Sequence, residues 1–355
     1  MISCGIQCLN CDYPIHMDTY TGCDHACKYC FVKHQHDIDE VNDLSSAKSL
    51  RDFISGKRNN ETRWCDWKIP LHWGANSDPF QPCERKFKRS LECLQIFAET
   101  KYPFIVSTKN PVMLCESEYL DALKECNCVI QISMACSKYD KLEPGAPSYE
   151  DRLKAAEILS NAWSIDDNGT EIGIHRVIAR VQPYFPDAHK EILAELPRYS
   201  SAGIFGILIE GYRSMIKQKG MEKRGGKLHK FPTELLKKRF TEIKEKCHEV
   251  HLDFTCVEEN LDWMSDNLTC CGTANMENLG FIPTPYNIAR IAYAEEGKEP
   301  QPTEAMQKLG TTRPFKCIRQ SQKWALFVKD KTYAEMIDYY AEDKVDHLRA
   351  LRDNG

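Results

Sequence analysis

Three cysteines stand close together in "TYTGCDHACKYCF", residues 19–31, and their spacing points to metal chemistry. Cys23, Cys27 and Cys30 follow a C-x₃-C-x₂-C pattern. Three thiolates in one loop can each bind one iron of a 4Fe–4S cluster, which leaves the fourth iron open to another ligand. Structural zinc takes four closed ligands, and here His25 would have to supply the fourth from inside the loop. The pattern favours an iron–sulfur cluster over zinc and over three unrelated thiols.

The same spacing occurs again near the N-terminus, in "CGIQCLNC". The three further thiols are Cys4, Cys8 and Cys11. The chain between them and the next apolar run is too short for a βα unit, so we expect an auxiliary metal site. A second iron–sulfur cluster is favoured over zinc and over unligated thiols, because a chain that receives one cluster is made where iron and sulfide are supplied. Cys270 or Cys271 in "NLTCCGT" is the first candidate for a fourth ligand, and Cys256 the next.

Composition indicates where such a chain works. It has 355 residues, 18 cysteines and a formal net charge of −5. No apolar run reaches the roughly 18 residues of a membrane span, and "MISCGIQCLNC" lacks the charged and apolar regions of a secretion signal. We therefore expect a cytoplasmic protein whose clustered cysteines bind metal instead of forming disulfides. The net charge gives no global reason to bind nucleic acid, although a local basic patch would still allow it.

The elements that must position the cysteines alternate along the chain. Strand-like apolar runs occupy residues 15–22, 68–77, 103–109, 129–136, 174–183 and 205–212. Helical patterns lie between them at 43–56, 83–100, 117–126, 148–163 and 187–203. Six βα units in series predict an α/β protein with a parallel sheet curled into a partial (β/α)6 barrel of the TIM type, with an open doubly wound sheet as the alternative.

Three regions follow from this reading. Residues 1–14 form a cysteine-containing extension, 15–250 the barrel, and 251–355 a mainly helical region that carries the Cys270/Cys271 loop. A seventh strand is expected at 250–259. Because reactive groups gather at the C-terminal ends of parallel strands, the residues that follow each strand are the ones to inspect for function.

Four segments in order resemble a known family. They are "YTGCDHACKYCF", "NSDPFQPCERK", "VSTKNP" and "LEPGAPSYEDRL". The cysteine loop, with an aromatic residue before its last cysteine, resembles the radical S-adenosylmethionine (radical SAM) superfamily. The four together resemble the radical SAM proteins similar to spore photoproduct lyase, whose segments read roughly GCxHxCxYCY, TDPYQPxE, TKS and EPxxPSxxxRL. The resemblance runs over about residues 18–215 and leaves out the first dozen residues and the last hundred.

The resemblance implies a cofactor chemistry. Cys23, Cys27 and Cys30 would hold the 4Fe–4S cluster, and its open iron would chelate the amino and carboxylate groups of S-adenosyl-L-methionine. An electron from a donor such as flavodoxin or ferredoxin would then release a 5′-deoxyadenosyl radical, which abstracts hydrogen from the substrate. In such enzymes the cofactor carries the chemistry and the protein supplies orientation and exclusion of water.

The resemblance also implies cofactor contacts near the first two strands. Tyr29 and Phe31 flank the last cysteine, where they would pack near the adenine or shield the cluster. Asn76, Ser77 and Asp78 end the second strand, where Asp78 would suit the methionine ammonium group. A plain turn is the alternative for this segment, since Ser-Asp-Pro is a common turn sequence.

Polar side chains at later strand ends would complete the cofactor site. Lys109 would pair with the cofactor carboxylate or a substrate anion, or would be a solvated charge. Ser133 would reach the ribose. Glu143 would contact the cofactor, or would pair with Arg152 and fix its own loop. The remaining members of this set are Ser107 and Arg180.

One departure from the family concerns the hydrogen-returning cysteine of the photoproduct lyase. That cysteine lies just before the Ser-Asp pair, where this chain has Ala75. The repair reaction of that enzyme is therefore not expected here in the same form. Cys83 and Tyr212 are the candidates for a catalytic residue.

The basic segment 217–239, with nine Lys and Arg residues, follows the sixth strand and could contact phosphates. Modification or repair of a nucleic-acid base is the preferred reaction on this ground, and a solvated charge run is the plain alternative. Two other functions stay open. One is an iron–sulfur or zinc scaffold that senses redox state and binds a partner, and the other is a zinc-stabilised nucleic-acid-binding module.

Overall fold

The apolar runs of the sequence form one curved sheet in the computed structural model, which describes residues 2–4, 15–34, 40–56, 70–266, 271–273 and 276. The strand order is β1-β2-β3-β4-β5-β7-β8-β12, with β6 paired to β7. Neighbouring strands from β2 to β12 along this path are parallel, whereas β1 and β6 are antiparallel to their partners. The strands are β1 (Ile2–Cys4), β2 (Ile15–Met17), β3 (Leu71–Trp73), β4 (Phe104–Thr108), β5 (Asn127–Ser133), β6 (Trp163–Ile165), β7 (Glu171–Tyr184), β8 (Gly206–Gly211) and β12 (Asp253–Cys256).

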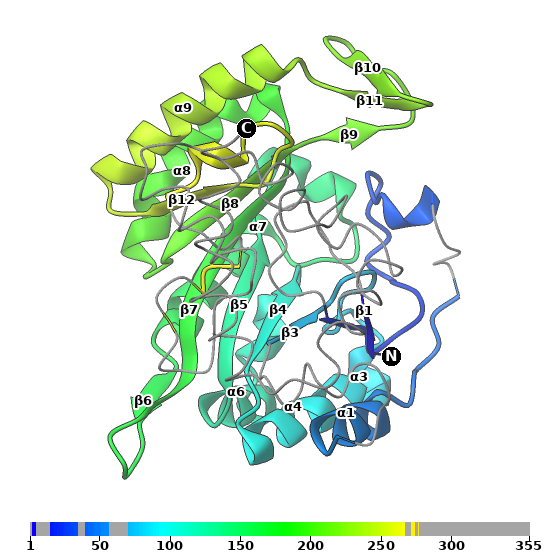
Figure 1. Ribbon diagram of the computed structural model, residues 1–355, viewed down its shortest axis with the longest axis vertical. Helices are drawn as coiled ribbons and strands as arrows, with labels where there is room; N and C mark the ends of the chain where they lie inside the picture. The colour runs from blue at the N-terminus through cyan, green and yellow to red at the C-terminus, as the bar shows by residue number, and fades with distance from the viewer. Residues whose placement is uncertain are drawn as a thin grey trace, which may run out of the picture.

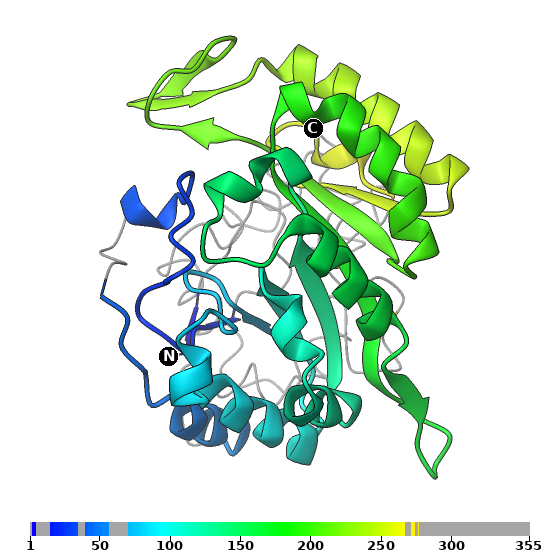
Figure 2. The ribbon, with the colours of Figure 1, turned by 180° about the vertical axis from the view of Figure 1, so that it is seen from behind.

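Helices cover one side of the sheet, as Figures 1 and 2 show from opposite directions. They are α1 (Ser46–Ile54), α3 (Glu84–Phe87), α4 (Arg89–Thr100), α5 (Pro111–Leu114), α6 (Ser117–Lys124), α7 (Tyr149–Ser160), α8 (His189–Ser201) and α9 (Thr233–Glu249). Short 3-10 turns complete the connections: η1 (Val32–His34), η2 (Ser137–Leu142), η3 (Pro186–Ala188) and η4 (Asp262–Met264). The α/β class and the partial TIM-type barrel expected from the sequence are confirmed.

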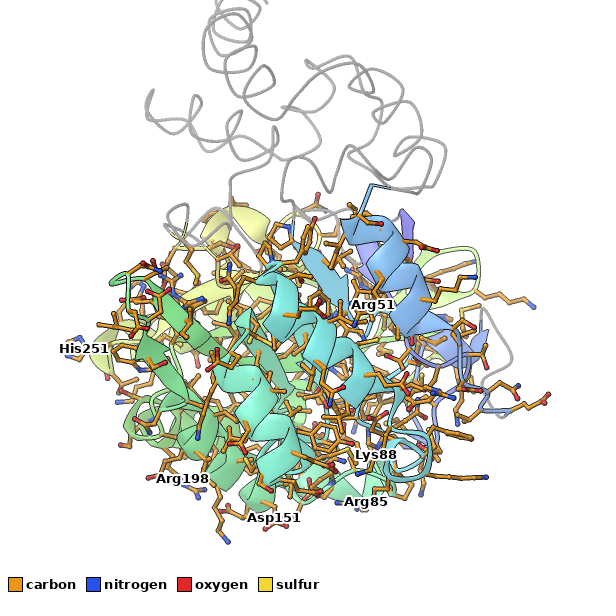
Figure 3. All side chains as sticks on the ribbon, turned by 90° about the horizontal axis from the view of Figure 1, so that it is seen from below. Arg51, Arg85, Lys88, Asp151, Arg198 and His251 are labelled. Atoms are coloured by element: carbon orange, nitrogen blue, oxygen red, sulfur yellow. The ribbon has the colours of Figure 1, made fainter. Side chains whose placement is uncertain are left out.

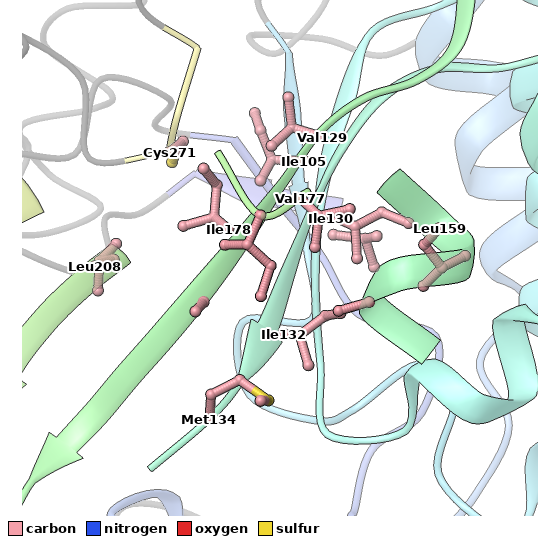
Figure 4. Packing of buried hydrophobic residues seen from close by; sticks show 14 of the residues in the cluster. Ile105, Val129, Ile130, Ile132, Met134, Leu159, Val177, Ile178, Leu208 and Cys271 are labelled. Carbon is pink, nitrogen blue, oxygen red and sulfur yellow. The ribbon is translucent and has the colours of Figure 1, made fainter. Parts of the chain in front are cut away.

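Side-chain alternation along the strands separates two buried layers. Trp73 points toward the helices and packs against Phe80, Phe97 and Phe104. On the opposite, concave face, Val129 and Ile178 lie together near Cys271 (Figure 4). The residues that alternate with these helix-facing side chains on β2, β3 and β4 therefore line the concave interior of the barrel.

A buried carboxylate joins the end of β2 to the outer layer. Glu84 accepts hydrogen bonds from the backbone N–H groups of Ser90 and Leu91, both 2.9 Å long, at the start of α4. The hydroxyl groups of Tyr20 and Tyr119 donate to the same carboxylate. An acidic group at a helix N-terminus satisfies donors that have no partner within the helix. The chain just before the cysteine loop is thereby fixed to a helix 64 residues away.

Two parts of the fold differ from the sequence expectation. The basic segment 217–239 contains a strand pair: β10 (Glu222–Gly225) and β11 (Leu228–Lys230) form a three-stranded antiparallel ribbon with β9 (Arg213–Ser214), before α9 begins. Figure 1 shows this ribbon projecting from the end of the barrel near β9. The expected strand 174–183 extends to 171–184 and forms a hairpin with β6. Both strand pairs are stabilised by backbone hydrogen bonds across a turn. A search for apolar periodicity does not predict strands of this kind.

β1 pairs with β2 from within residues 1–14, and β12 falls within the seventh strand expected at 250–259. Across the described ranges, none of the helices has the length and apolar character that a membrane crossing requires.

Candidate functional site

The three-cysteine loop begins six residues after β2, at the C-terminal edge of the parallel sheet. Cys27 is buried, Cys23 and Cys30 are half-buried, and none forms a disulfide. Burial and the nearby Asp78 carboxylate raise the pKa of Cys23 to about 12. Burial raises the pKa of Cys27 to about 11. Thiols in this setting ionise only when a cation compensates the charge, which is what bound iron or zinc would do.

The donor set fits a multi-iron cluster better than a single ion. Among the residues that the structure describes, no three His, Cys, Asp or Glu side chains converge as ligands of one metal ion. A 4Fe–4S cluster does not require this, because each thiolate binds a different iron. His25, the candidate fourth zinc ligand, uses both ring nitrogens elsewhere: Nδ1 is 2.9 Å from the Gly145 carbonyl oxygen and Nε2 is 3.0 Å from Asp78 Oδ2.

The segment 142–145 clamps the loop backbone. The N–H of Lys28 donates to the Leu142 carbonyl at 2.8 Å, and the N–H of Gly145 donates to the His25 carbonyl at 3.0 Å. A Cβ at Gly145 would lie 2.7 Å from the Asp24 carbonyl oxygen, too close for any side chain. Glycine at this position lets the two segments touch. These backbone contacts give the loop a defined shape.

Asp78 ties three segments together. Its Oδ1 accepts from the Phe80 N–H at 2.9 Å and from the Thr108 hydroxyl at 2.8 Å. Its Oδ2 accepts from His25 and, at 2.6 Å, from the Lys109 N–H. Burial alone would raise the pKa of Asp78, but His25 and the hydrogen bonds lower it below its usual value. An ionised Asp78 thus joins the cysteine loop to the ends of β3 and β4, and the predicted contact with an ammonium group stays a prediction.

A second charged group lies behind Tyr29. Lys109 Nζ is 2.7 Å from Glu143 Oε1 and 2.9 Å from the Tyr29 hydroxyl. Tyr29 also donates to Glu143, and Arg152 donates to the other carboxylate oxygen. Burial would raise the pKa of Glu143, yet Lys109 and Arg152 lower it to about 2. The structure contains the expected Glu143–Arg152 pair, and Arg152 also donates to the Ser133 carbonyl at 2.9 Å.

Asn76 and Ser77 hold the ends of β2 and β3 together through Asp18, which the sequence reading missed. Asp18 Oδ1 accepts from the backbone N–H groups of Asn76 and Ser77, at 2.9 and 3.1 Å. The Asn76 side chain donates to Oδ2 at 3.0 Å, and the Ser77 hydroxyl donates to the Tyr20 carbonyl at 2.8 Å. The position of Asp18, an acidic residue directly after the "IHM" strand, was the sequence signal that could have identified it.

The other aromatic and thiol candidates occupy different surroundings. Phe31 is 59% exposed. Cys83 lies beside the loop: its N–H donates to Asp24 Oδ2 at 2.9 Å, and burial with nearby acidic groups raises its pKa to about 12. Tyr212 packs on Phe185, whose ring also contacts Tyr29. Phe185 thus links Tyr212 to the cysteine loop.

The concave interior carries a connected polar set. Arg180 Nη1 is 2.8 Å from the Ser107 hydroxyl, so two predicted residues from β4 and β7 meet. Arg180 also bonds Gln182, which bonds Glu210 on β8. The sequence reading missed His16 and His72, which lie on β2 and β3 opposite each other in register. A polar residue between two apolar ones in "IHM" and "LHW" was the signal for them.

The second cysteine group falls largely outside the described residues, to which Cys8, Cys11, Cys270 and the side chain of Cys4 do not belong. The backbone of Cys4 ends β1 and pairs with Ile15 at the start of β2. Cys271 is fully buried.

Comparisons with known proteins agree with this fold. No protein-family model matches the chain. An uncharacterized protein of Mycobacterium tuberculosis is 22% identical over 200 residues, which cover 54% of this chain and 56% of that protein. The chain thus matches little more than half the length of this curated relative. An uncharacterized protein of Acidianus two-tailed virus is 26% identical over 247 residues, 64% of this chain and 78% of that protein.

A solved structure shows the same architecture. A mutant of spore photoproduct lyase superposes with a TM-score of 0.51 at 14% identity, over 69% of this chain and 76% of the lyase chain. The chain therefore shares the fold of spore photoproduct lyase, as its motifs predict.

Proposed function

We propose that this protein is a radical SAM enzyme. The observation that carries the proposal is the loop with Cys23, Cys27 and Cys30, held at the C-terminal edge of the parallel sheet by segment 142–145 and by Asp78. A 4Fe–4S cluster with S-adenosylmethionine supplies, when bound and reduced, a 5′-deoxyadenosyl radical that abstracts a hydrogen atom from the substrate.

The residues around the loop would bind and shield rather than react. The three thiols would each hold one iron. Lys109 keeps a side chain that is 18% exposed beside the loop, where its ammonium group pairs with Glu143. Arg152 is shared between Glu143 and Asp140. The partly exposed ammonium group of Lys109 would suit a carboxylate of the cofactor. Tyr29 and Phe185 would exclude water from the same side.

Anaerobic reconstitution tests the proposal. Full-length protein supplied with iron, sulfide, S-adenosylmethionine and dithionite should turn brown and release 5′-deoxyadenosine, and flavodoxin or ferredoxin should replace dithionite. The triple variant C23A/C27A/C30A should form no product. Cys115→Ala is the matched control, because Cys115 is half-buried and its thiol donates to the Pro111 and Ala155 carbonyls, away from the three-cysteine loop in sequence. A brown protein that does not cleave the cofactor would support an iron–sulfur scaffold instead, and a colourless zinc protein would support a binding module.

For the substrate, we propose a nucleic acid whose backbone contacts the ribbon β9–β11. Four exposed lysines surround the ribbon: Lys217, Lys219, Lys223 and Lys227. Met215 and Ile216 beside them are 39% and 77% exposed, which is unusual for apolar residues of their size. Lysines that neutralise phosphates with an adjacent apolar side chain for base contacts are typical of nucleic-acid surfaces. Modification of a base is the reaction that this surface favours.

Salt-dependent binding tests the ribbon. The variant K223E/K227E should weaken binding of a fluorescent single-stranded oligonucleotide and lower the slope of log K against log salt by about 1.4, roughly 0.7 for each phosphate contact removed. Lys88→Glu is the control, since Lys88 lies on the periphery (Figure 3) and pairs with Glu118. An unchanged slope in K223E/K227E would exclude the ribbon as the phosphate-binding surface.

We also propose that Cys4, Cys8 and Cys11 hold an auxiliary iron–sulfur cluster with Cys270 or Cys271. The β1–β2 pairing supports this, because it fixes the backbone of Cys4 beside Ile15 at the start of β2, whereas the loop of Cys23 follows the end of that strand. Iron and sulfide counts on C270A and C271A, prepared separately, test the fourth ligand. Full iron content in both variants would exclude these two cysteines.

A further inference from the structure

His16 and His72 form a pair of buried imidazoles in the concave interior of the barrel. Their Cα atoms are partners across β2 and β3, and their rings meet edge to face with centroids 5.9 Å apart. The residues on either side of them, such as Trp73, point the opposite way toward the helices. His16 is 7% exposed and His72 is 3% exposed.

Each ring has a nitrogen without a partner among the described residues. These atoms are His16 Nε2 and His72 Nδ1, both inaccessible to solvent. A buried polar atom without a hydrogen bond is rare in folded proteins, and each one calls for an explanation, such as a bound ligand or water.

The hydrogen bonds around Ser107 fix the tautomer of His72. Arg180 Nη1 can only donate, and it lies 2.8 Å from Ser107 Oγ and 3.2 Å from Gln131 Oε1. The single hydroxyl hydrogen of Ser107 goes to Gln131 Oε1, 3.0 Å away. Ser107 must then accept from His72 Nε2–H at 2.9 Å. His72 Nδ1 is therefore a bare lone pair, available as a hydrogen-bond acceptor.

Both rings are neutral. Burial lowers the pKa of His16 to about 4. Burial and the neighbouring Arg180 charge hold the pKa of His72 well below its usual value. A neutral acceptor at Nδ1 suits an N–H group or a metal ion. Two features disfavour the metal: Arg180 places a fixed positive charge on the same Ser107 hydroxyl, and no third ligand converges within the described residues.

We propose that His72 Nδ1, with His16 beside it, accepts a hydrogen bond from an N–H on the edge of a substrate nucleobase held in the barrel interior. Resting on the proposed function, this inference deepens it by assigning the residues that read the substrate. The polar set Arg180, Gln182 and Glu210 lies further along the same face, where it offers both donors and acceptors to the rest of the base.

The test uses nitrogen NMR on full-length, cluster-reconstituted protein with ¹⁵N-labelled histidine, kept oxidised and without S-adenosylmethionine. Uridine is the probe, and 3-methyluridine is the matched probe that lacks the imide N–H. Without a probe, His72 should show a protonated Nε2 and a bare Nδ1. Uridine should move the Nδ1 resonance upfield as it accepts a hydrogen bond, and 3-methyluridine should leave it in place.

His72→Gln keeps a group that reaches Ser107 and removes the Nδ1 acceptor. It should weaken uridine binding by about tenfold, the loss expected for one buried hydrogen bond. His248→Gln is the control, because His248 is half-exposed and pairs with Asp266. H248Q should bind uridine as the wild type does.

Three results would overturn the inference: no shift with uridine, equal shifts with both nucleosides, or coordination of added Zn²⁺ by both histidines. None depends on cofactor cleavage. Loss of the radical reaction with a normal uridine shift would refute only the proposed function, and normal cofactor cleavage without the shift would refute only this inference. The wild-type titration keeps the test valid even if H72Q fails to fold.

Discussion

Two groups of buried polar residues differ in their hydrogen bonds. One is the polar shell behind the cysteine loop, which consists of Asp78, Lys109, Glu143 and Arg152, and the other is the histidine pair in the barrel interior. Asp78 and Glu143 are ionised, and each meets at least one positively charged partner. His16 and His72 are neutral, and each has a nitrogen without a partner among the described residues. A fully hydrogen-bonded group fixes the segments around it, whereas an unpartnered buried nitrogen calls for an explanation, such as a ligand. The difference separates the residues that build the site from those that would read a ligand.

The largest effect is expected where the saturated shell is broken. Arg152→Ala removes a side chain that is 1% exposed and bonds Glu143 and two carbonyl groups. We expect a loss of about 3–5 kcal/mol in the free energy of unfolding, because a buried carboxylate loses a partner. Urea unfolding measures it.

Arg198→Ala is the control for this substitution. Arg198 is 43% exposed, pairs with Glu150 on the surface and lies on the periphery in Figure 3. Its loss should cost below about 1 kcal/mol. Equal losses in R152A and R198A would contradict the contrast between the buried shell and the surface.

A medium loss in the free energy of unfolding is expected when the pH is lowered. Lys109 and Arg152 outweigh burial and lower the pKa of Glu143 to about 2, from an ordinary 4.5. Because the folded pKa is the lower one, this carboxylate stabilises the fold fully above pH 4.5, and the contribution disappears as the pH falls toward 2. Wild type should lose about 3 kcal/mol more than Glu143→Gln over that window. Parallel stability curves for the two proteins would show that the shell does not depend on this charge.

The smallest effect is expected at the unsaturated pair. His16→Leu removes an unpartnered buried nitrogen, whose burial costs about 1–3 kcal/mol, so stability should stay within about 1 kcal/mol of wild type or rise. His189→Leu is the matched comparison, since both ring nitrogens of buried His189 have partners, Tyr184 and Glu242. H189L should therefore be clearly the less stable of the two in thermal unfolding. The reverse order would mean that His16 is satisfied within the protein.

Much of the barrel could be predicted because each strand buries a continuous apolar run. The runs at 103–109 and 129–136 correspond to β4 and β5 within a few residues. The ribbon at β10 and β11 was not predicted, because charged strands that pair across the Gly226-Lys227 turn carry no apolar pattern. The hairpin of β6 escaped for a related reason: Trp163 and Ile165 are largely exposed.

The sequence predicted which residues belong to the site better than it predicted which residues they contact. Ser107 lies near the end of β4 and Lys109 directly follows it, whereas Glu143 follows the turn η2 and Arg180 lies within β7. Their partners come from other strands, so the Arg180–Ser107 contact depends on sheet order and register. The full occupation of Asp78 by four donors is likewise a property of packing, which no local sequence pattern encodes.

The contact between His25 and Gly145 joins positions 120 residues apart. During synthesis the three thiols of the loop leave the ribosome long before the segment that clamps them. The segment around Asp78, which also contacts His25, leaves the ribosome well before Gly145 does. The loop therefore gains its contacts in two stages, and the clamp from Gly145 is added only after β2, β3, β4 and β5 have been synthesised.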